Sequence, residues 1–204
     1  MVSYDTEVSR PAPGRRDCLR GLLGVTGTLA LGALPLSTLP VTGALAAAPI
    51  GRRLSATRRL SFHSLHTDER LSATYLRDGR RDRGAMAEID ALLRDWRTAE
   101  VRPIDPRLLD QLFALKESLG SSGTFQVVSG YRSPETNAKL AALSDGVAKR
   151  SYHMRGMAID IRLSDRKLPE LHEAALALRS GGVGLYTKSD FLHLDTGGVR
   201  RWGG

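Results

Sequence analysis

Two histidines and an aspartate occur at spacings that could bind a transition metal. His153 and Asp160 lie seven residues apart in one short segment, and His193 follows at the centre of a second apolar segment. Two imidazoles and one carboxylate form a three-ligand set that suits zinc and leaves one coordination position open. An open zinc site is typical of hydrolases, because zinc lowers the pKa of its bound water to about 7. The pattern therefore predicts a hydrolytic metal centre.

The competing interpretation is that these histidines are unrelated structural residues, and for either histidine alone that would be the better interpretation. The chain has five histidines, and its single cysteine, Cys18, lies near the N-terminus. The part of the chain after the N-terminal segment therefore has no thiol for a nucleophile, a disulfide or a metal. We favour the metal site because the three residues of the set occur together.

The chain after residue 59 shows the patterns of short strands and amphipathic helices. Apolar or alternating runs predict strands at 60–66, 71–76, 125–128, 157–161, 183–186 and 191–195. Helical spacing, with capping residues or prolines at several starts, predicts helices at 85–96, 106–119, 134–140 and 168–179. Helices and strands do not alternate as they do in parallel βαβ folds. We predict an α+β domain with a small antiparallel sheet and flanking helices.

These elements could bring the metal-binding residues together. Asp160 lies in one predicted strand and His193 in another, so one face of a sheet could present both. Alternate residues of a strand share a face, and Asp195 is therefore expected beside His193, as a hydrogen-bond partner for its ring. His153 lies in an irregular segment where Gly156 allows a sharp turn.

The N-terminal segment has the features of an export signal. Arg15 and Arg16 precede a stretch without charge that runs from residue 21 to residue 51. Small residues at positions 44 and 46 suit cleavage after Ala46, and the paired arginines indicate a twin-arginine (Tat) signal. We predict a signal peptide at 1–46, a basic linker at 47–59 and one domain at 60–204, in the periplasm or cell envelope. An uncleaved membrane anchor is the alternative; on the main interpretation the protein meets the membrane only through the transient signal.

The chain is basic, which favours anionic partners. The formal net charge is +8, of which residues 1–46 contribute +1, so +7 remains after their removal. For an exported protein the nearest polyanions are the cell wall and the membrane head groups. Nucleic acid is not expected as a partner, because the sequence has no basic strip interleaved with aromatic residues and no known binding motif.

Several motifs together resemble a known family. The chain resembles the M15 zinc peptidases in two motifs, Ser-x-His-x-x-Gly-x-Ala-x-Asp at 151–160 and Asp-x-x-His at 190–193. Within that family it is most similar to the exported murein endopeptidases of the MepK type. The likeness to that branch extends over the segments SGYRSPETN at 129–137, LLRDWR at 92–97, PIDPRLL at 103–109 and GGVGLY at 181–186. The resemblance covers about residues 60–202. It implies the fold of D-Ala-D-Ala carboxypeptidases and hedgehog-like zinc peptidases.

The resemblance also implies roles for individual residues. His153, Asp160 and His193 match the family's zinc ligands. Asp190 matches its general base, which would take a proton from metal-activated water and deliver it to the leaving amine. Arg132 matches an arginine that would hold a substrate carbonyl or carboxylate and stabilise the oxyanion. The competing interpretations are a turn residue for Asp190 and an ordinary surface arginine for Arg132.

The resulting expectation is a Zn²⁺-dependent metallopeptidase that hydrolyses amide bonds in the stem-peptide cross-links of peptidoglycan. Two alternatives stay open. One is a D,D-carboxypeptidase of the same family, because spacing does not reveal which bond is cleaved. The other is a non-catalytic, zinc-bearing module that binds the cell wall, since a fold does not by itself establish catalysis.

Overall fold

The computed structural model describes residues 56–143 and 147–203. The predicted signal peptide and residues 47–55 of the predicted linker lie outside this part of the chain. Arg58 and Arg59, which the sequence placed in the linker, begin the first strand. None of the helices among the described residues is long and apolar enough to cross a membrane.

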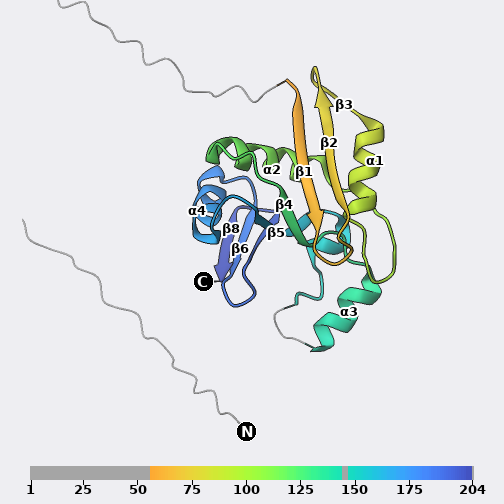
Figure 1. Ribbon diagram of the computed structural model, residues 1–204. Coiled ribbons are helices and arrows are strands. Elements are labelled where there is room, and N and C mark those ends of the chain that lie inside the picture. The colour runs from red at the N-terminus through yellow and green to blue at the C-terminus, as the bar shows by residue number, and fades with distance from the viewer. Residues whose placement is uncertain (1–55, 144–146, 204) are drawn as a thin grey trace, which may run out of the picture. The chain divides into compact units, whose positions relative to one another are not determined.

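The described residues form eight strands, four α-helices and one 3₁₀ helix (Figure 1). The N-terminal half contains β1 (Arg58–Ser64), β2 (Arg70–Arg77), β3 (Arg80–Arg81), α1 (Arg83–Leu92), α2 (Pro106–Leu119), β4 (Phe125–Ser129) and α3 (Pro134–Leu143). The C-terminal half contains η1 (Tyr152–Arg155), β5 (Ala158–Leu163), α4 (Leu168–Leu178), β6 (Gly182–Tyr186), β7 (Phe191–Asp195) and β8 (Arg200–Gly203).

The strands form one mixed sheet in the order β3-β2-β1-β4-β5-β7-β6-β8. Neighbouring strands are antiparallel except for two parallel pairs, β1 with β4 and β6 with β8. The predicted α+β class is confirmed. The sheet is larger than predicted and not wholly antiparallel, because the sequence patterns did not reveal β3 and β8 and could not show which strands pair.

Two pairs of predicted strands that are consecutive in the chain form antiparallel hairpins, and most of the predicted helix boundaries are confirmed. β1 pairs antiparallel with β2, and β6 with β7. At the start of α2 the Asp105 side chain accepts a hydrogen bond from the Arg107 N–H, and at its end Gly120 adopts the left-handed conformation with a φ of 56°. At the start of α3 the Ser133 hydroxyl accepts a hydrogen bond from the Thr136 N–H.

The first helix ends earlier than predicted, at Leu92 and not at Trp96. The chain leaves the helix because the buried Asp95 carboxylate accepts hydrogen bonds from the backbone N–H groups of Arg97 and Ser133. Trp96 therefore lies outside the helix on the surface, where its ring stacks on His66 at 4.4 Å between centroids. The apolar spacing alone could not indicate this exit.

The hydrophobic core lies between the sheet and the helices. α2 crosses behind β1 in Figure 1, and α4 contacts β5, β6 and β7. Along β5 and β7 the core side chains occupy alternate positions: Ile159, Ile161, Leu192 and Leu194. Because side chains alternate between the faces of a strand, the residues between them point to the other face. The packing of the core therefore determines which residues are available for a site.

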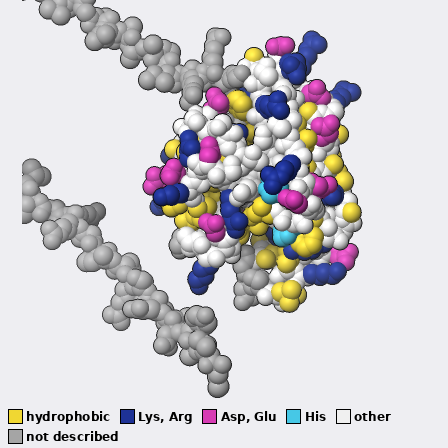
Figure 2. Space-filling view, viewed as in Figure 1, with side chains coloured by type: hydrophobic (Ala, Val, Ile, Leu, Met, Phe, Trp, Pro, Cys, Tyr) yellow, Lys and Arg dark blue, Asp and Glu magenta, His cyan; other side chains and the backbone are white. Residues whose placement is uncertain are grey.

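Charged side chains of both signs cover the surface. On the face shown in Figure 2, lysines and arginines are interspersed with acidic side chains. Several arginines form ion pairs; Arg58 and Arg81 both contact Asp110, at 2.6 and 2.7 Å. Part of the positive charge is thus neutralised by ion pairs within the protein.

Candidate metal centre

Asp160 and His193 face each other across two neighbouring strands. β5 and β7 are antiparallel, and their register pairs Asp160 with His193. Both residues alternate with core residues, so they point to the face opposite the helices. A slip of one residue would place an isoleucine or a leucine at these positions. The register set by the core therefore brings two of the three predicted ligands together.

His153 comes from the short helix η1. Its position is held from both sides: the Ser151 hydroxyl caps the helix, and Gly156 ends it in the left-handed conformation with a φ of 65°. The backbone carbonyl of His153 also accepts a hydrogen bond from the Arg132 N–H at 3.2 Å. The turn expected at Gly156 is confirmed, although the short helix before it was not predicted.

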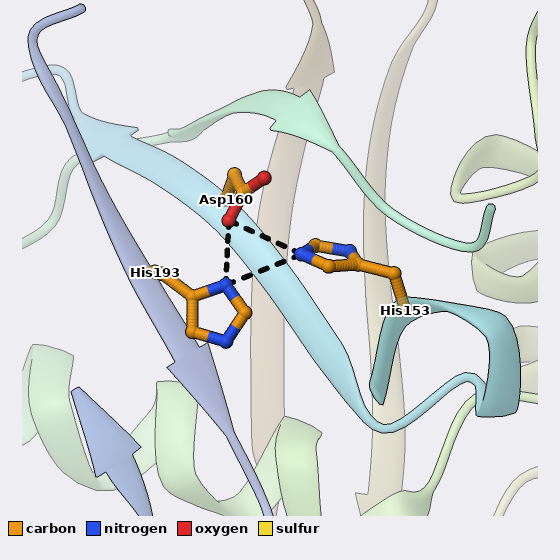
Figure 3. A group of neighbouring side chains, drawn as sticks. All are labelled: His153, Asp160 and His193. Carbon is orange, nitrogen blue, oxygen red and sulfur yellow. Dashed lines mark hydrogen bonds and ion pairs between the residues drawn. The ribbon is translucent and has the colours of Figure 1, made fainter. Parts of the chain in front are cut away.

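The three side chains converge on one point, as Figure 3 shows. His193 Nδ1 lies 2.8 Å from Asp160 Oδ1, and His153 Nε2 lies 3.2 Å from each of these atoms. All three side chains are buried. Donor atoms around a tetrahedral ion with bonds of about 2.0–2.1 Å are separated by about 3.3 Å, which the two 3.2 Å spacings match, whereas the 2.8 Å spacing is that of a hydrogen bond.

Each imidazole is held through the nitrogen that points away from the cluster. His153 Nδ1 lies 2.7 Å from the carbonyl oxygen of Gly130, to which it donates. His193 Nε2 lies 3.1 Å from Asp195 Oδ2, the partner expected from the sequence. With these nitrogens protonated, the nitrogens facing the cluster carry lone pairs. Three acceptors then meet with no hydrogen between them, an arrangement that requires a cation.

Without a metal ion, a proton on His193 supplies the positive charge that the three acceptor atoms require. Burial would lower the pKa of His193, but hydrogen bonds to Asp160 and Asp195 outweigh it and raise that pKa to about 9. Burial would raise the pKa of Asp160, but the charges and hydrogen bonds of His153 and His193 hold it well below its usual range. In the metal-free protein at neutral pH, His193 is therefore protonated and Asp160 ionised.

Arg132 lies beside the cluster with spare hydrogen-bonding capacity. One of its nitrogens is 3.7 Å from Asp160 Oδ2, and its contacts with Ser129 and Asn137 are long, at 3.5 and 3.4 Å. Its Nε is buried and has no hydrogen-bond partner within the described part of the chain. Burial lowers the pKa of the guanidinium, and the attraction of Asp160 opposes that change. The side chain lines the same hollow as the three proposed ligands.

Asp190 is not brought into the cluster. It lies in the turn before β7 with a φ of 51°, and its side chain is 67% exposed. Its carboxylate contacts Arg162 at 3.2 Å, and it lines a different hollow, together with Arg162 and Arg166. Asp160 is the one carboxylate among the described residues that line the metal-site hollow. The next residue, Phe191, does line that hollow.

The hollow around the cluster has a volume of about 380 Å³ and includes residues that the sequence did not single out. Its aromatic and basic walls are Tyr152, Tyr186, Phe191, Trp202, Arg150 and Arg200. Ser151, the first residue of the motif at 151–160, lines the hollow, whereas Tyr131 does not. Tyr131 is buried, with its hydroxyl donating to Glu100 at 2.6 Å. Among these wall residues, only Tyr186 is itself one of the residues that carry the resemblance to the family, in the segment 181–186.

The chain is similar to known peptidoglycan endopeptidases over most of its length. Residues 52–202 match the family model described as Peptidoglycan L,D-endopeptidase MepK. The chain is 40% identical to "Peptidoglycan L,D-endopeptidase MepK" of Escherichia coli K12 over 189 residues, which cover 91% of this chain and 98% of that protein. It is also 40% identical to "Probable peptidoglycan L,D-endopeptidase MepK" of Haemophilus influenzae over 148 residues, 72% of this chain and 80% of that protein. No solved structure was matched.

Proposed function

This chain belongs to the Peptidoglycan L,D-endopeptidase MepK family, and we propose that it is a zinc-dependent peptidase that hydrolyses amide bonds in the peptide cross-links of peptidoglycan. The observation that carries the proposal is the convergence of His153 Nε2, His193 Nδ1 and Asp160 Oδ1 within 3.2 Å of one another. Their position in an open hollow beside a partly buried arginine supports a catalytic role over a purely structural one.

The three proposed ligands would hold the ion, and each has a distinct support. His153 is oriented by a backbone carbonyl, His193 by a carboxylate, and Asp160 by the register of β5 with β7. A divalent ion bound there would supply a Lewis acid for the scissile carbonyl and would lower the pKa of a nearby water molecule.

Arg132 is proposed to bind the carbonyl oxygen of the scissile amide. A guanidinium offers five donors in a fixed plane, and several of those of Arg132 have long contacts or none. Negative charge develops on the carbonyl oxygen as the amide is attacked, so a partly buried cation there stabilises the transition state more than the ground state.

Asp190 is proposed as the proton acceptor, on the basis of the family pattern. The role requires its carboxylate to exchange the ion pair with Arg162 for a position facing the hollow. Asp190 is exposed and lies directly before Phe191, so a change of side-chain rotamer and of the turn could bring it there. Proton transfer would then run from the attacking water to Asp190 and onward to the leaving amine.

The proposal includes export. The predicted Tat signal at 1–46 would direct export. The linker at 47–59 and the peptidase domain at 60–204 would then reach the cell envelope, where the substrate lies. The basic surface would assist its approach to an anionic wall.

The test is digestion of purified peptidoglycan sacculi, followed by chromatography of the released muropeptides. Wild-type protein loaded with zinc is expected to convert cross-linked dimers to monomers, and a chelator should stop the conversion. Shortened stem peptides with unchanged cross-linking would instead indicate a carboxypeptidase. His153→Ala and His193→Ala should lose bound zinc and activity together. An unchanged muropeptide profile with zinc-loaded protein would refute the proposal and favour a wall-binding module.

A further inference from the structure

Two glycines open a gap in the sheet next to the candidate metal centre. β6 lies between β7 and β8, and its register places Gly182 between Asp195 and Arg200, and Gly184 between His193 and Trp202. Side chains two strands apart in a sheet are normally separated by the side chains of the strand between them. Here the middle strand has none at these two positions.

The gap is filled by side chains from both neighbouring strands. A Cβ atom at Gly182 would lie 2.5 Å from Asp195 Oδ2 and 2.6 Å from Arg200 Nη1. A Cβ atom at Gly184 would lie 2.5 Å from the Trp202 ring. All three distances are shorter than a Cβ atom normally allows, so glycine at these positions lets β8 contact β7 across β6.

Through this gap Arg200 holds the buried carboxylate of Asp195. Its two terminal nitrogens donate to Oδ1 at 3.0 Å and to Oδ2 at 2.6 Å, a bidentate pair. The guanidinium is itself fixed between two aromatic rings, 5.2 Å from the centre of Tyr152 and 5.0 Å from that of Trp202. Asp195 is completely buried and also accepts hydrogen bonds from the N–H groups of Gly182 and Gly197.

Asp195 in turn determines the orientation of His193. One oxygen of the carboxylate accepts from Arg200 and from His193 Nε2, so the proton of the imidazole stays on Nε2 and Nδ1 faces the cluster. We propose that Arg200 is a positioning residue for the metal centre: by holding Asp195 across the glycine gap, it determines that His193 binds the ion through Nδ1. This inference rests on the metal site of the proposed function. It makes the C-terminal strand β8 part of the site.

A purely structural role is the alternative, in which Arg200 only attaches β8 to the sheet. The two roles differ in what they predict for the metal. An anchoring residue would affect the stability of the fold and leave the intrinsic affinity of the folded protein for zinc unchanged. A positioning residue affects zinc affinity even where folding is intact, typically by about 10- to 100-fold for residues that orient ligands.

The first experiment uses the wild-type protein. The ¹⁵N-labelled chain is loaded with ¹¹³Cd, and NMR couplings between ¹¹³Cd and ¹⁵N identify the nitrogen of each histidine that binds the ion. Coupling is expected to Nδ1 of His193 and to Nε2 of His153. Coupling to Nε2 of His193 would overturn the proposal, because that nitrogen could not then donate to Asp195.

The second experiment compares Arg200→Met, Arg200→Lys and the control Arg201→Met in zinc competition with a chelator. Arg201 is the exposed neighbour on β8. Arg200→Met should lower the zinc affinity by about tenfold or more, Arg200→Lys should recover part of the loss, and Arg201→Met should match wild type. Circular dichroism identifies the variants that are folded.

The outcomes separate this inference from the proposed function. Wild-type zinc affinity in folded Arg200→Met, or in folded Arg200→Lys if the methionine variant does not fold, would overturn the positioning role and leave the peptidase proposal intact. Weaker zinc binding in an Arg200 variant, together with a wild-type protein that does not cleave sacculi, would support the positioning role and refute the peptidase.

Discussion

At the scale of single residues, a proton and a metal ion compete for the same atom. In the metal-free protein His193 donates from both ring nitrogens to Asp160 and Asp195, which is why its pKa is raised from the ordinary 6.5 to about 9. Zinc can bind Nδ1 only after that proton has left. The chemistry of the site is therefore linked to pH through one side chain.

The expected result is that zinc affinity rises by about tenfold per pH unit as the pH approaches about 9, and then levels off. The stability of the metal-free fold should show the opposite trend, because a raised pKa stabilises the folded state fully below pH 6.5 and loses that contribution as the pH rises through 9. Calorimetry of zinc binding in two buffers with different ionisation enthalpies measures the proton released. Zinc binding without proton release at pH 7 would contradict the assignment.

Asp190 is the residue whose sequence-based role differs most from its position in the structure. Asp190→Asn is expected to keep bound zinc and to lose turnover by about 10²- to 10⁴-fold, because the amide cannot accept the proton. Arg162→Gln is the matched control: it removes the ion-pair partner of Asp190 and leaves the carboxylate in place. Muropeptide release per bound zinc is the measurement. Full activity in Asp190→Asn would remove the residue from the mechanism.

At the scale of elements, the site depends on the turn that joins η1 to β5. Gly156 has a φ of 65°, and a Cβ there would lie 2.4 Å from the carbonyl oxygen of Pro103. That close approach brings the segment before α2 against the turn, where the Asp105 N–H donates to the Gly156 carbonyl at 2.8 Å. The helix carrying His153 is thus attached to the core helix α2.

Gly156→Ala should destabilise the protein by more than the roughly 1–2 kcal/mol expected for an alanine in the left-handed region, because it also displaces backbone. Gly79→Ala provides the control: Gly79 has a φ of 75° and nothing within 4 Å of the added Cβ. Urea denaturation of both variants gives the comparison. Equal losses of stability would show that the contact with Pro103 has no cost.

At the scale of the whole molecule, the metal is expected to act as a cross-link between segments far apart in the chain. The ligands come from η1, β5 and β7, so an ion that binds only the folded state stabilises all three. With free zinc at 100 times its Kd, the free energy of unfolding should increase by about 2.7 kcal/mol.

For a domain of this size, that increase corresponds to a rise in Tm of about 5–10 °C. Thermal denaturation with zinc and with a chelator checks it. His153→Ala, which lacks one ligand, should give the same Tm in both conditions. A wild-type Tm that does not respond to zinc would mean that the cluster does not hold the ion.

Local sequence patterns determined the parts of this protein that depend on neighbouring residues. Asp105 and Pro106 start α2, Gly120 ends it, and Ser133 caps α3, because capping involves atoms within one helical turn. Period two likewise assigned Asp160 and Ile161 to opposite faces of β5, since alternation is a property of every strand. The three proposed ligands and their partner Asp195 followed from such patterns together with the family motif.

Only the tertiary structure decided which other residues contact the proposed ligands and Asp190. The parallel pairing of β8 with β6 brings Arg200 to Asp195, the end of β4 brings the Gly130 carbonyl to His153, and Arg162 holds Asp190 outside the cluster. Each of these contacts depends on strand order and register, which no short segment of sequence specifies. Sequence therefore identified the groups that could bind a metal, whereas the folded sheet determined which of their atoms face it.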